Sequence, residues 1–326
     1  MKLGIIITTY NRPKKVLELY KSLKSIVPEN VIITIVDSSE ITNLELNIEL
    51  KENYVKSNHK NQPFQRYLGF LNNSSDLLLY LDDDMEIYNK SFYDIIFETF
   101  LNNDIVGLAI KFINKQEDSL SEIPKTKIKV NQISRKIIGY LTGYPSLDDG
   151  LFGYCGLRGN QPQFGGLTQW ISGGAFVAKR NYLFKNFNFQ LFDLFENKLG
   201  MGEDAILGYT LSKQGNIYYS PVLMFLHNDN KDSNYSTNHL AFSKRVTFSR
   251  LYLTLEKARL DNKNMIYPYF LFHWFVLFRN IGLFISFIQN RNKSTFNMLK
   301  GAFLGWYLAS FNYRFRYNNS ISKYRV

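Results

Sequence analysis

The chain has a single cysteine, Cys155, among its 326 residues. One thiol excludes a disulfide within the chain and a zinc site built from several cysteines. Such scarcity is typical of proteins from a reducing compartment. The first residues also lack the pattern of a cleavable signal peptide, because the opening apolar run is short and ends at Thr8-Thr9. We therefore expect a cytoplasmic protein.

Glycine-rich phosphate loops are also missing, since neither GxGxxG nor GxxxxGK[ST] occurs after a strand-like run. This disfavours an ordinary dinucleotide-binding dehydrogenase and a P-loop enzyme. Acidic residues are scarce in one region only. Residues 241–326 hold 14 Lys and Arg against two acids, whereas residues 1–240 are nearly neutral. The net charge of +11 therefore belongs to the C-terminal part, and hydrophobic residues, at 45%, are sufficient for a sizeable core.

The first 110 residues alternate between buried-strand patterns and helical patterns. Apolar, β-rich runs occupy residues 3–8, 31–36, 77–81 and 105–110, and helical spacing occupies residues 13–26, 62–71 and 92–101. Strand–helix–strand order predicts a parallel sheet with helices on both faces. We predict an α/β domain over residues 1–240, with a further strand at 170–178, short strands at 217–226 that break at Pro221, and a helix from Glu203. Gly and Pro are dense at 139–166, which predicts loops and short antiparallel strands.

Polar residues follow three of the predicted strands: Thr8 to Pro13, Asp37, and Asp82-Asp83-Asp84. Carboxyl ends of parallel strands share one edge of a sheet, where ligands of open α/β folds bind. Three consecutive aspartates repel one another unless a cation lies among them, and carboxylates suit Mg²⁺ or Mn²⁺. The alternative from spacing alone is a solvated acidic loop. Glu203-Asp204 could likewise serve only the helix dipole.

In their order along the chain, these segments resemble the family 2 glycosyltransferases, which have the GT-A fold. The resemblance spans about residues 3–230. It rests on Ile5 to Pro13, Asp37, Gln65-Arg66-Tyr67-Leu68-Gly69 (with Tyr67 in place of the usual Asn), the DxD-like Asp82-Asp83-Asp84, Ser172-Gly173-Gly174-Ala175, Gly202-Glu203-Asp204 and His227.

The resemblance implies an inverting, metal-dependent transferase that moves a sugar from a nucleotide-diphosphate donor, most often UDP, to a hydroxyl of a glycan or lipid-linked acceptor. It implies Asp204 as the general base and Asp84 and His227 as ligands of Mg²⁺ or Mn²⁺. The implied nucleotide-sugar-binding residues are Thr8, Tyr10, Arg12, Asp37, Arg66, Asp82 and Asp83. The implied acceptor-binding residues are Trp170, Gly173, Gly174 and Glu203.

The C-terminal part, residues 241–326, reads as a basic, aromatic helical extension. Residues 265–278 carry no formal charge, Arg279-Asn280 interrupt the run, and residues 281–288 are apolar again. Because a spanning helix needs about 20 apolar residues, we expect interfacial helices on an anionic membrane, peripheral on its inner face. The alternative is a helical subdomain that only covers the core. Apolar runs of this density exclude nucleic acid as the partner. Residues 275–280 also resemble a segment of bacterial family members that build surface polysaccharides.

Two other functions remain open from sequence. A sugar nucleotidyltransferase also uses an α/β nucleotide-binding domain and Mg²⁺, but it would carry a Gly-rich basic loop after its first strand, and Thr8 to Pro13 is not one. A non-catalytic carbohydrate- or membrane-binding module is disfavoured by the acids that the chain retains. We therefore predict an enzyme of glycan or polysaccharide biosynthesis.

Overall fold

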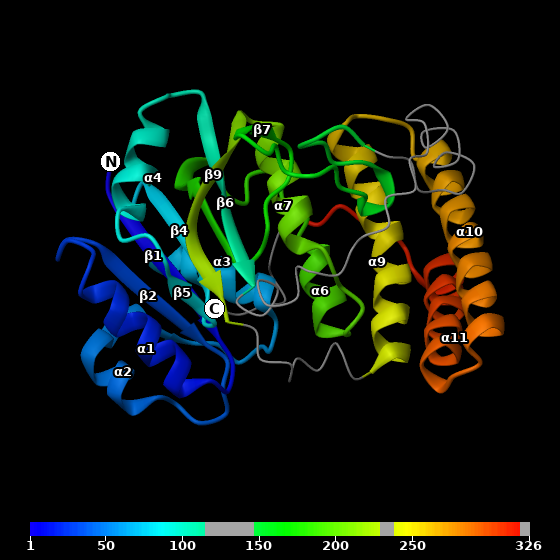
Figure 1. The fold of residues 1–326 in the computed structure, drawn as a ribbon, viewed down its shortest axis with the longest axis horizontal. Helices are drawn as coiled ribbons and strands as arrows, with labels where there is room; N and C mark the ends of the chain where they lie inside the picture. Colours follow the sequence, from blue (N-terminus) through cyan, green and yellow to red (C-terminus); the bar gives the residue numbers. More distant parts are fainter. Residues whose placement is uncertain (115–146, 229–237, 320–326) are drawn as a thin grey trace.

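The computed structural model describes residues 1–114, 147–228 and 238–319. Its centre is a nine-stranded sheet in the order β3-β2-β1-β4-β8-β6-β9-β5, with β7 paired to β9 (Figure 1). The strands are β1 (Leu3–Thr9), β2 (Ile32–Asp37), β3 (Tyr54–Lys56), β4 (Leu77–Asp82), β5 (Met85–Ile87), β6 (Ile105–Asn114), β7 (Gly166–Thr168), β8 (Ala175–Lys179) and β9 (Asn216–His227). Part of the loop region predicted at 139–166 lies outside the described residues.

Six strands run in one direction, and β5, β7 and β8 run against their neighbours. The predicted α/β class with a mostly parallel sheet and C-terminal helices is confirmed. The strand predicted at 170–178 is displaced, because β8 begins only at Ala175. The strand at 217–226 is not broken at Pro221. Instead β9 continues through it, and the register against β6 shifts there.

Helices cover both faces because buried strand residues alternate between them. Ile5 and Ile7 belong to the core under α1, whereas Ile6 belongs to the core on the opposite side. The helices of the first face are α1 (Pro13–Lys24), α2 (Leu44–Leu50) and α4 (Phe92–Phe100), and those of the second are α3 (Gln62–Asn72), α6 (Gln190–Glu196) and α7 (Glu203–Ser212). Short turns of 3₁₀ helix lie at Lys51–Asn53, Tyr154–Gly156 and Arg180–Tyr182.

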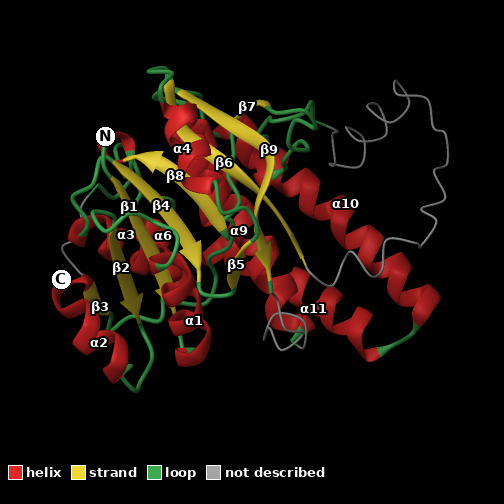
Figure 2. Cartoon of the chain, turned by 60° about the vertical axis from the view of Figure 1, so that its left-hand side comes forward, coloured by secondary structure: helices red, strands yellow, loops and turns green. Residues whose placement is uncertain are grey.

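Three long helices complete the second face. They are α9 (His239–Leu260), α10 (Ile266–Asn290) and α11 (Lys293–Tyr307), with a π-helical turn at Leu308–Asn312. The pair α10 and α11 lies beyond α9 from the sheet (Figure 1, Figure 2). The two apolar runs on either side of Arg279-Asn280 belong to one helix, since α10 runs through both residues. The division into residues 1–240 and 241–326 stays a prediction.

Candidate active site

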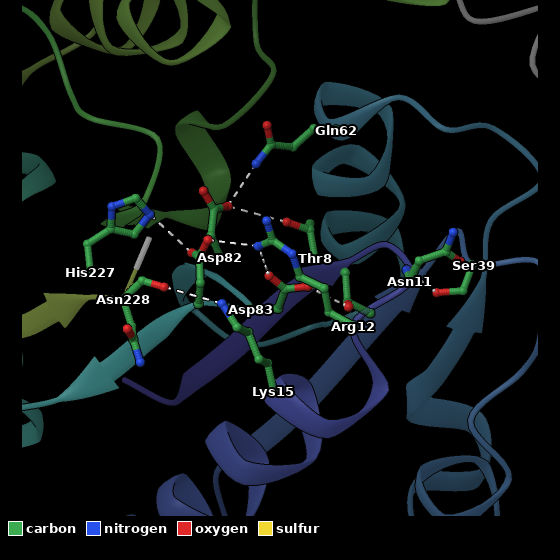
Figure 3. Close-up of polar contacts among 12 residues, drawn as sticks. Thr8, Asn11, Arg12, Lys15, Ser39, Gln62, Asp82, Asp83, His227 and Asn228 are labelled. Atoms are coloured by element: carbon green, nitrogen blue, oxygen red, sulfur yellow. Dashed lines mark hydrogen bonds and ion pairs between the residues drawn. The ribbon is translucent and has the colours of Figure 1, made fainter. Parts of the chain in front are cut away.

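The three acids predicted at a strand end lie where β4 turns into β5 (Figure 3). Thr8 is paired with Asp82 in the β1–β4 ladder, so the end of β1 lies beside the acids. The Thr9 hydroxyl donates to Asp83 Oδ2 at 2.7 Å, and that of Thr8 points to Asp82 Oδ1 at 3.4 Å. Strand pairing therefore positions this cluster before any ligand is present.

Arg12 supplies the positive charge next to these acids. Its Nη1 lies 2.8 Å from Asp83 Oδ1 and 2.7 Å from Asp84 Oδ2, and both aspartates are buried (Figure 3). Burial raises the pKa of Asp83 above its ordinary value, although Thr9 and Arg12 oppose it. Burial acts in the same sense on Asp84, but His227 and Arg12 outweigh it and lower the pKa of Asp84. Asp84 is thus held as a carboxylate.

Asp84 and His227 face each other across β5 and β9. His227 is the register partner of Met85, and its Nε2 lies 3.2 Å from Asp84 Oδ1. That carboxylate oxygen is buried and makes no well-directed hydrogen bond with any residue that the structure describes. Two neighbouring ligands of an octahedral Mg²⁺ lie about 3 Å apart, so this pair fits two positions around one cation.

The two residues would be a partial ligand set only. Over residues 1–114, 147–228 and 238–319, no group of three or more His, Cys, Asp or Glu side chains is spaced to hold a metal ion. Mg²⁺ commonly takes one or two protein ligands and completes its shell with substrate phosphates and water. The residues present therefore fit an ion that arrives with a phosphate ligand.

Arg66, on α3, connects these acids to the start of α7. Its side chain is buried, and Nη2 lies 3.2 Å from Asp82 Oδ1 and donates to the Gly173 carbonyl at 2.8 Å. Nη1 lies 3.2 Å from Glu203 Oε1. A Cβ on Gly173 would lie 3.0 Å from the Arg66 guanidinium, so the absence of a side chain there matters. Burial raises the pKa of Asp82 to about 6 against the opposing effect of Arg66.

Asp204 lies in the first turn of α7, after Gly202 in a left-handed conformation with φ of 80°. Its two oxygens accept from the Gly173 amide at 3.0 Å and the Ala205 amide at 2.8 Å. These two amides hold the Asp204 carboxylate in a fixed orientation. For the neighbouring Glu203, burial and the charge of Asp204 raise the pKa. Asp204 is therefore the predicted proton acceptor, with a carboxylate that the backbone fixes in place.

Trp170 lies on the Asp204 side of the site. The Arg158 guanidinium is 5.2 Å from the centre of the Trp170 ring, and Nη1 is 3.5 Å from Asp204 Oδ2. Gly174 lies under the acids, since its carbonyl accepts from the Asp82 amide at 3.0 Å. A Cβ there would meet Met85 at 2.1 Å. Of the four predicted acceptor-side residues, Gly173 and Glu203 contact Arg66, Trp170 lies beside Arg158, and Gly174 contacts Asp82.

Asp37 ends β2 and is paired with Thr9 in the β1–β2 ladder. Its buried carboxylate accepts from the Tyr54 hydroxyl and, at 2.7 Å, from the Ser39 amide. Tyr10 is more open, with 42% of its side chain exposed. The Lys60 ammonium lies 5.1 Å from the centre of the Tyr10 ring. Asp37 and Asp82 thus flank the end of β1, and Asp204 is joined to the same edge through Gly173 and Arg66.

Three residues at this edge were not predicted from sequence. Gln62 donates to Asp82 Oδ1 at 2.8 Å (Figure 3). Arg158 reaches Asp204, and Lys60 lies over Tyr10. Gln62 is the first residue of α3, just before the Gln65-Arg66 segment. That position was the only feature of the sequence that could have indicated a role in the site. Two shallow cavities lie at the opposite ends of the strands, beside Asp76 and Lys179 and beside Asp104 and Gly215.

Comparisons with known proteins give distant structural matches. No protein-family model matches the sequence, and no curated protein matches it. The TarS 1-349 structure from S. aureus has 14% identity and a TM-score of 0.45, over 93% of this chain and 91% of that one. Glucosyl-3-phosphoglycerate synthase from Mycobacterium tuberculosis, with Mn²⁺, UDP-glucose and phosphoglyceric acid, has 12% identity and a TM-score of 0.47, over 79% and 80%.

The mannosyltransferase PcManGT from Pyrobaculum calidifontis, with GDP-Man and Mn²⁺, has 8% identity and a TM-score of 0.46, over 96% of this chain and 88% of that one. At these identities and TM-scores, the matches bring no residue role, substrate or metal to this chain.

Proposed function

We propose that this chain is a GT-A glycosyltransferase of the family 2 type, which moves a sugar with inversion from a nucleotide-diphosphate donor to an acceptor hydroxyl. One observation carries the proposal. The acids of β2, β4 and α7 meet at a single sheet edge, where Arg66 lies 3.2 Å from Asp82 and 3.2 Å from Glu203. A transferase needs its donor site and its proton acceptor within reach of one reacting carbon.

The donor half of the site consists of the ends of β1, β2 and β4. Tyr10, exposed beside Lys60, offers a ring for the nucleobase, and Asp37 and Thr8 would hold the nucleoside. Asp82 would contact the ribose. Arg12 would leave the carboxylates of Asp83 and Asp84 and turn to the diphosphate, for which its guanidinium is suited. UDP is the donor nucleotide that we expect first.

Asp84 and His227 would hold a Mg²⁺ or Mn²⁺ ion. Such an ion supplies charge neutralisation to the leaving diphosphate. Asp84 suits this role, because its pKa is lowered and its Oδ1 lies 3.2 Å from His227 Nε2.

Asp204 would take the proton from the acceptor hydroxyl as that oxygen attacks the anomeric carbon opposite the leaving group. A single attack of this kind inverts the configuration. The amides of Gly173 and Ala205 hold the carboxylate in place, and Arg158 lies beside it over Trp170. Glu203, whose pKa is raised by burial, is tied to Arg66 and would orient the acceptor. The acceptor class that we propose is a glycan or a lipid-linked glycan of the cell surface.

The test combines a binding assay with a turnover assay. Nucleotide sugars are screened with Mn²⁺ by thermal shift on the full chain, since a ligand of the native state raises its melting temperature. Consumption of the donor that gives the largest shift is then measured. We expect Asp204→Asn to keep the shift and to lose turnover by about a hundredfold or more, the usual contribution of a general base.

Asp94→Asn is the matched control, because Asp94 lies exposed in the first turn of α4 and should leave turnover unchanged. Asp84→Ala should lose the Mn²⁺-dependent part of the shift. Donor consumption that continues at the wild-type rate in Asp204→Asn and Asp84→Ala contradicts the assignment. Pyrophosphate release from a sugar phosphate and a nucleoside triphosphate would instead show a nucleotidyltransferase.

A further inference from the structure

The outer faces of α10 and α11 expose apolar side chains in a regular pattern. We call this surface the α10–α11 face and define it by Leu277, Ile281, Phe284 and Ile288 on α10 with Phe296 and Phe303 on α11. Each of these side chains is between 43% and 52% exposed. The α10 members recur every three or four residues, so they form one stripe along the helix.

The inner faces of the same helices are held by α9. On α10, Phe272, Phe275 and Val276 are buried, and Arg279 donates to the Thr247 hydroxyl of α9 at 2.6 Å. On α11, the backbone at Gly305 approaches α9 so closely that a Cβ would lie 2.4 Å from the Lys244 carbonyl oxygen. The helices α10 and α11 lie beyond α9 from the sheet (Figure 1, Figure 2). Because their inner faces pack on α9, the exposed α10–α11 face is opposite that contact.

The charges around this face have one sign. Residues 262–326 contain nine Lys and Arg and no Asp or Glu. Arg291 and Lys293 lie exposed at the turn between α10 and α11, and Lys300 lies exposed on α11. Over the described residues 262–319, every charged side chain is thus a cation. An apolar stripe with such cations beside it is complementary to an anionic phospholipid bilayer, whose acyl chains accept the stripe and whose headgroups accept the cations.

We propose that the α10–α11 face binds the surface of an anionic bilayer, with both helices lying in the plane of the interface. This proposal is independent of the transferase function. Within the described residues, α10 is the one helix whose length and composition would let it cross a membrane. An 18-residue stretch of α10 has a mean hydropathy of 1.7, and 22% of that stretch is buried. Its packing opposes a crossing.

Three features favour the in-plane position. Arg279 lies in the middle of α10 and is bonded to α9, so a spanning α10 would draw that contact into the hydrocarbon. Phe272 and Phe275 belong to the same hydrophobic core as sheet residues such as Phe176, so α10 is packed on the α/β layer. The 15 residues of α11 extend about 22 Å, which is short of the roughly 30 Å needed to return across the bilayer.

The test measures cosedimentation of the full chain with vesicles of phosphatidylcholine alone and of phosphatidylcholine mixed with phosphatidylglycerol. We expect binding to the anionic vesicles at low salt, loss of most binding at high salt, and little binding to the neutral vesicles. Phe284→Gln combined with Ile288→Gln should weaken binding about tenfold or more. Arg291→Gln combined with Lys293→Gln should weaken it about fivefold for each charge removed.

Matched variants on the α/β layer control for general changes of surface. Ile41→Gln with Leu101→Gln replaces two exposed apolar side chains, and Lys90→Gln with Lys185→Gln removes two exposed cations. Both pairs should bind vesicles as the wild type does. Because every substituted side chain is exposed, circular dichroism and thermal melting should show that all variants fold alike.

Three outcomes would overturn the proposal. The wild type could stay off anionic vesicles at low salt. It could form a dimer that Phe284→Gln with Ile288→Gln dissociates, without vesicle binding, which would make the α10–α11 face a contact between two copies. It could also resist release by high salt and alkaline carbonate, which would show a spanning α10 in place of helices that lie in the interface.

Discussion

Arg12 occupies a position in which a divalent cation would compete with it. Its guanidinium lies within 2.8 Å of both Asp83 and Asp84, and Asp84 is also the predicted metal ligand. Removing this positive charge increases the repulsion between the two carboxylates, although His227 still lies 3.2 Å from Asp84. We therefore expect Arg12→Ala to bind Mn²⁺ about fivefold more tightly in the absence of nucleotide, a gain of about 1 kcal/mol for a partly exposed ion pair. Titration calorimetry or the Mn²⁺ electron paramagnetic resonance signal measures this directly.

Lys15→Ala is the control for the Arg12 experiment. Lys15 lies on α1 nearby, but its ammonium bonds the Asn228 carbonyl at 3.2 Å and not the acids (Figure 3). Its removal should change Mn²⁺ affinity only slightly. Equal or weaker Mn²⁺ binding by Arg12→Ala would show that Arg12 does not compete with the cation and that the acids need it for their arrangement.

Some residues of the site could be predicted from the sequence around them, and others could not. Asp82 to Asp84 and Asp37 could be predicted because each follows a buried strand, and strand ends gather at one edge. Arg158 and Lys60 could not, because both lie in irregular segments and reach Asp204 and Tyr10 only through tertiary packing. The spacing of residues along the sequence does not indicate such tertiary contacts.

At the scale of elements, α11 packs on α9 through two glycines one turn apart. A Cβ on Gly301 would lie 2.3 Å from the Leu240 carbonyl oxygen, and one on Gly305 would lie 2.4 Å from the Lys244 carbonyl oxygen. Both neighbours are backbone atoms, so the helices must separate to admit a side chain. We expect Gly305→Ala to lower the free energy of unfolding by about 1–3 kcal/mol, measured by urea denaturation.

Gly282→Ala tests the same substitution without the contact. Gly282 lies in α10 with nothing within 4 Å of a Cβ, so only the helix propensity changes. Alanine is favoured over glycine in a helix by up to about 1 kcal/mol. We therefore expect Gly282→Ala to be at least as stable as the wild type and more stable than Gly305→Ala. A Gly305→Ala protein as stable as Gly282→Ala would mean that the α9–α11 contact is looser than described.

The elements that sequence misplaced are those in which packing overrides local signals. The polar pair Arg279-Asn280 interrupts the apolar run of the sequence but not the helix. Within α10, Arg279 bonds Thr247 and Asn280 is buried on the inner face. Pro221 suggested a strand end, yet β9 places it where the β6–β9 register shifts and a missing N–H is tolerated. Strands β1, β2 and β4 were predictable because their runs are continuous and apolar.

At the scale of the whole molecule, α9 joins the C-terminal helices to the α/β layer. Phe248, Leu251 and Tyr252 of α9 belong to the same core cluster as Ile6 and Phe176 of the sheet. The composition change near residue 240 was visible in the sequence, because charge is counted along the chain. The shared core was not visible in the sequence. Polar and apolar residues are mixed around the whole circumference of α9, so no apolar stripe marks the side that packs on the α/β layer.

Asp261 provides the polar part of this connection. It directly follows α9, and its carboxylate meets the Tyr209 hydroxyl on α7 and Lys213 directly after α7. It also lies 2.6 Å from Lys257 on α9. Burial would raise the pKa of Asp261, but these three partners outweigh it and lower the pKa below its ordinary value. A lowered folded-state pKa means stability that is present above the unfolded value of about 3.9 and lost as the pH falls through the folded value.

We expect Asp261→Asn to lower the free energy of unfolding by about 2 kcal/mol at neutral pH, the scale of hydrogen bonds to a charged group. The difference from wild type should shrink below about pH 4, because the wild-type carboxyl then also takes up a proton. Urea denaturation across the acid range measures both stabilities, with Asp94→Asn as an exposed control. A difference that stays constant through the acid range would mean that the ionised carboxylate does not tie α9 to α7, and that the two layers are held together by the apolar core alone.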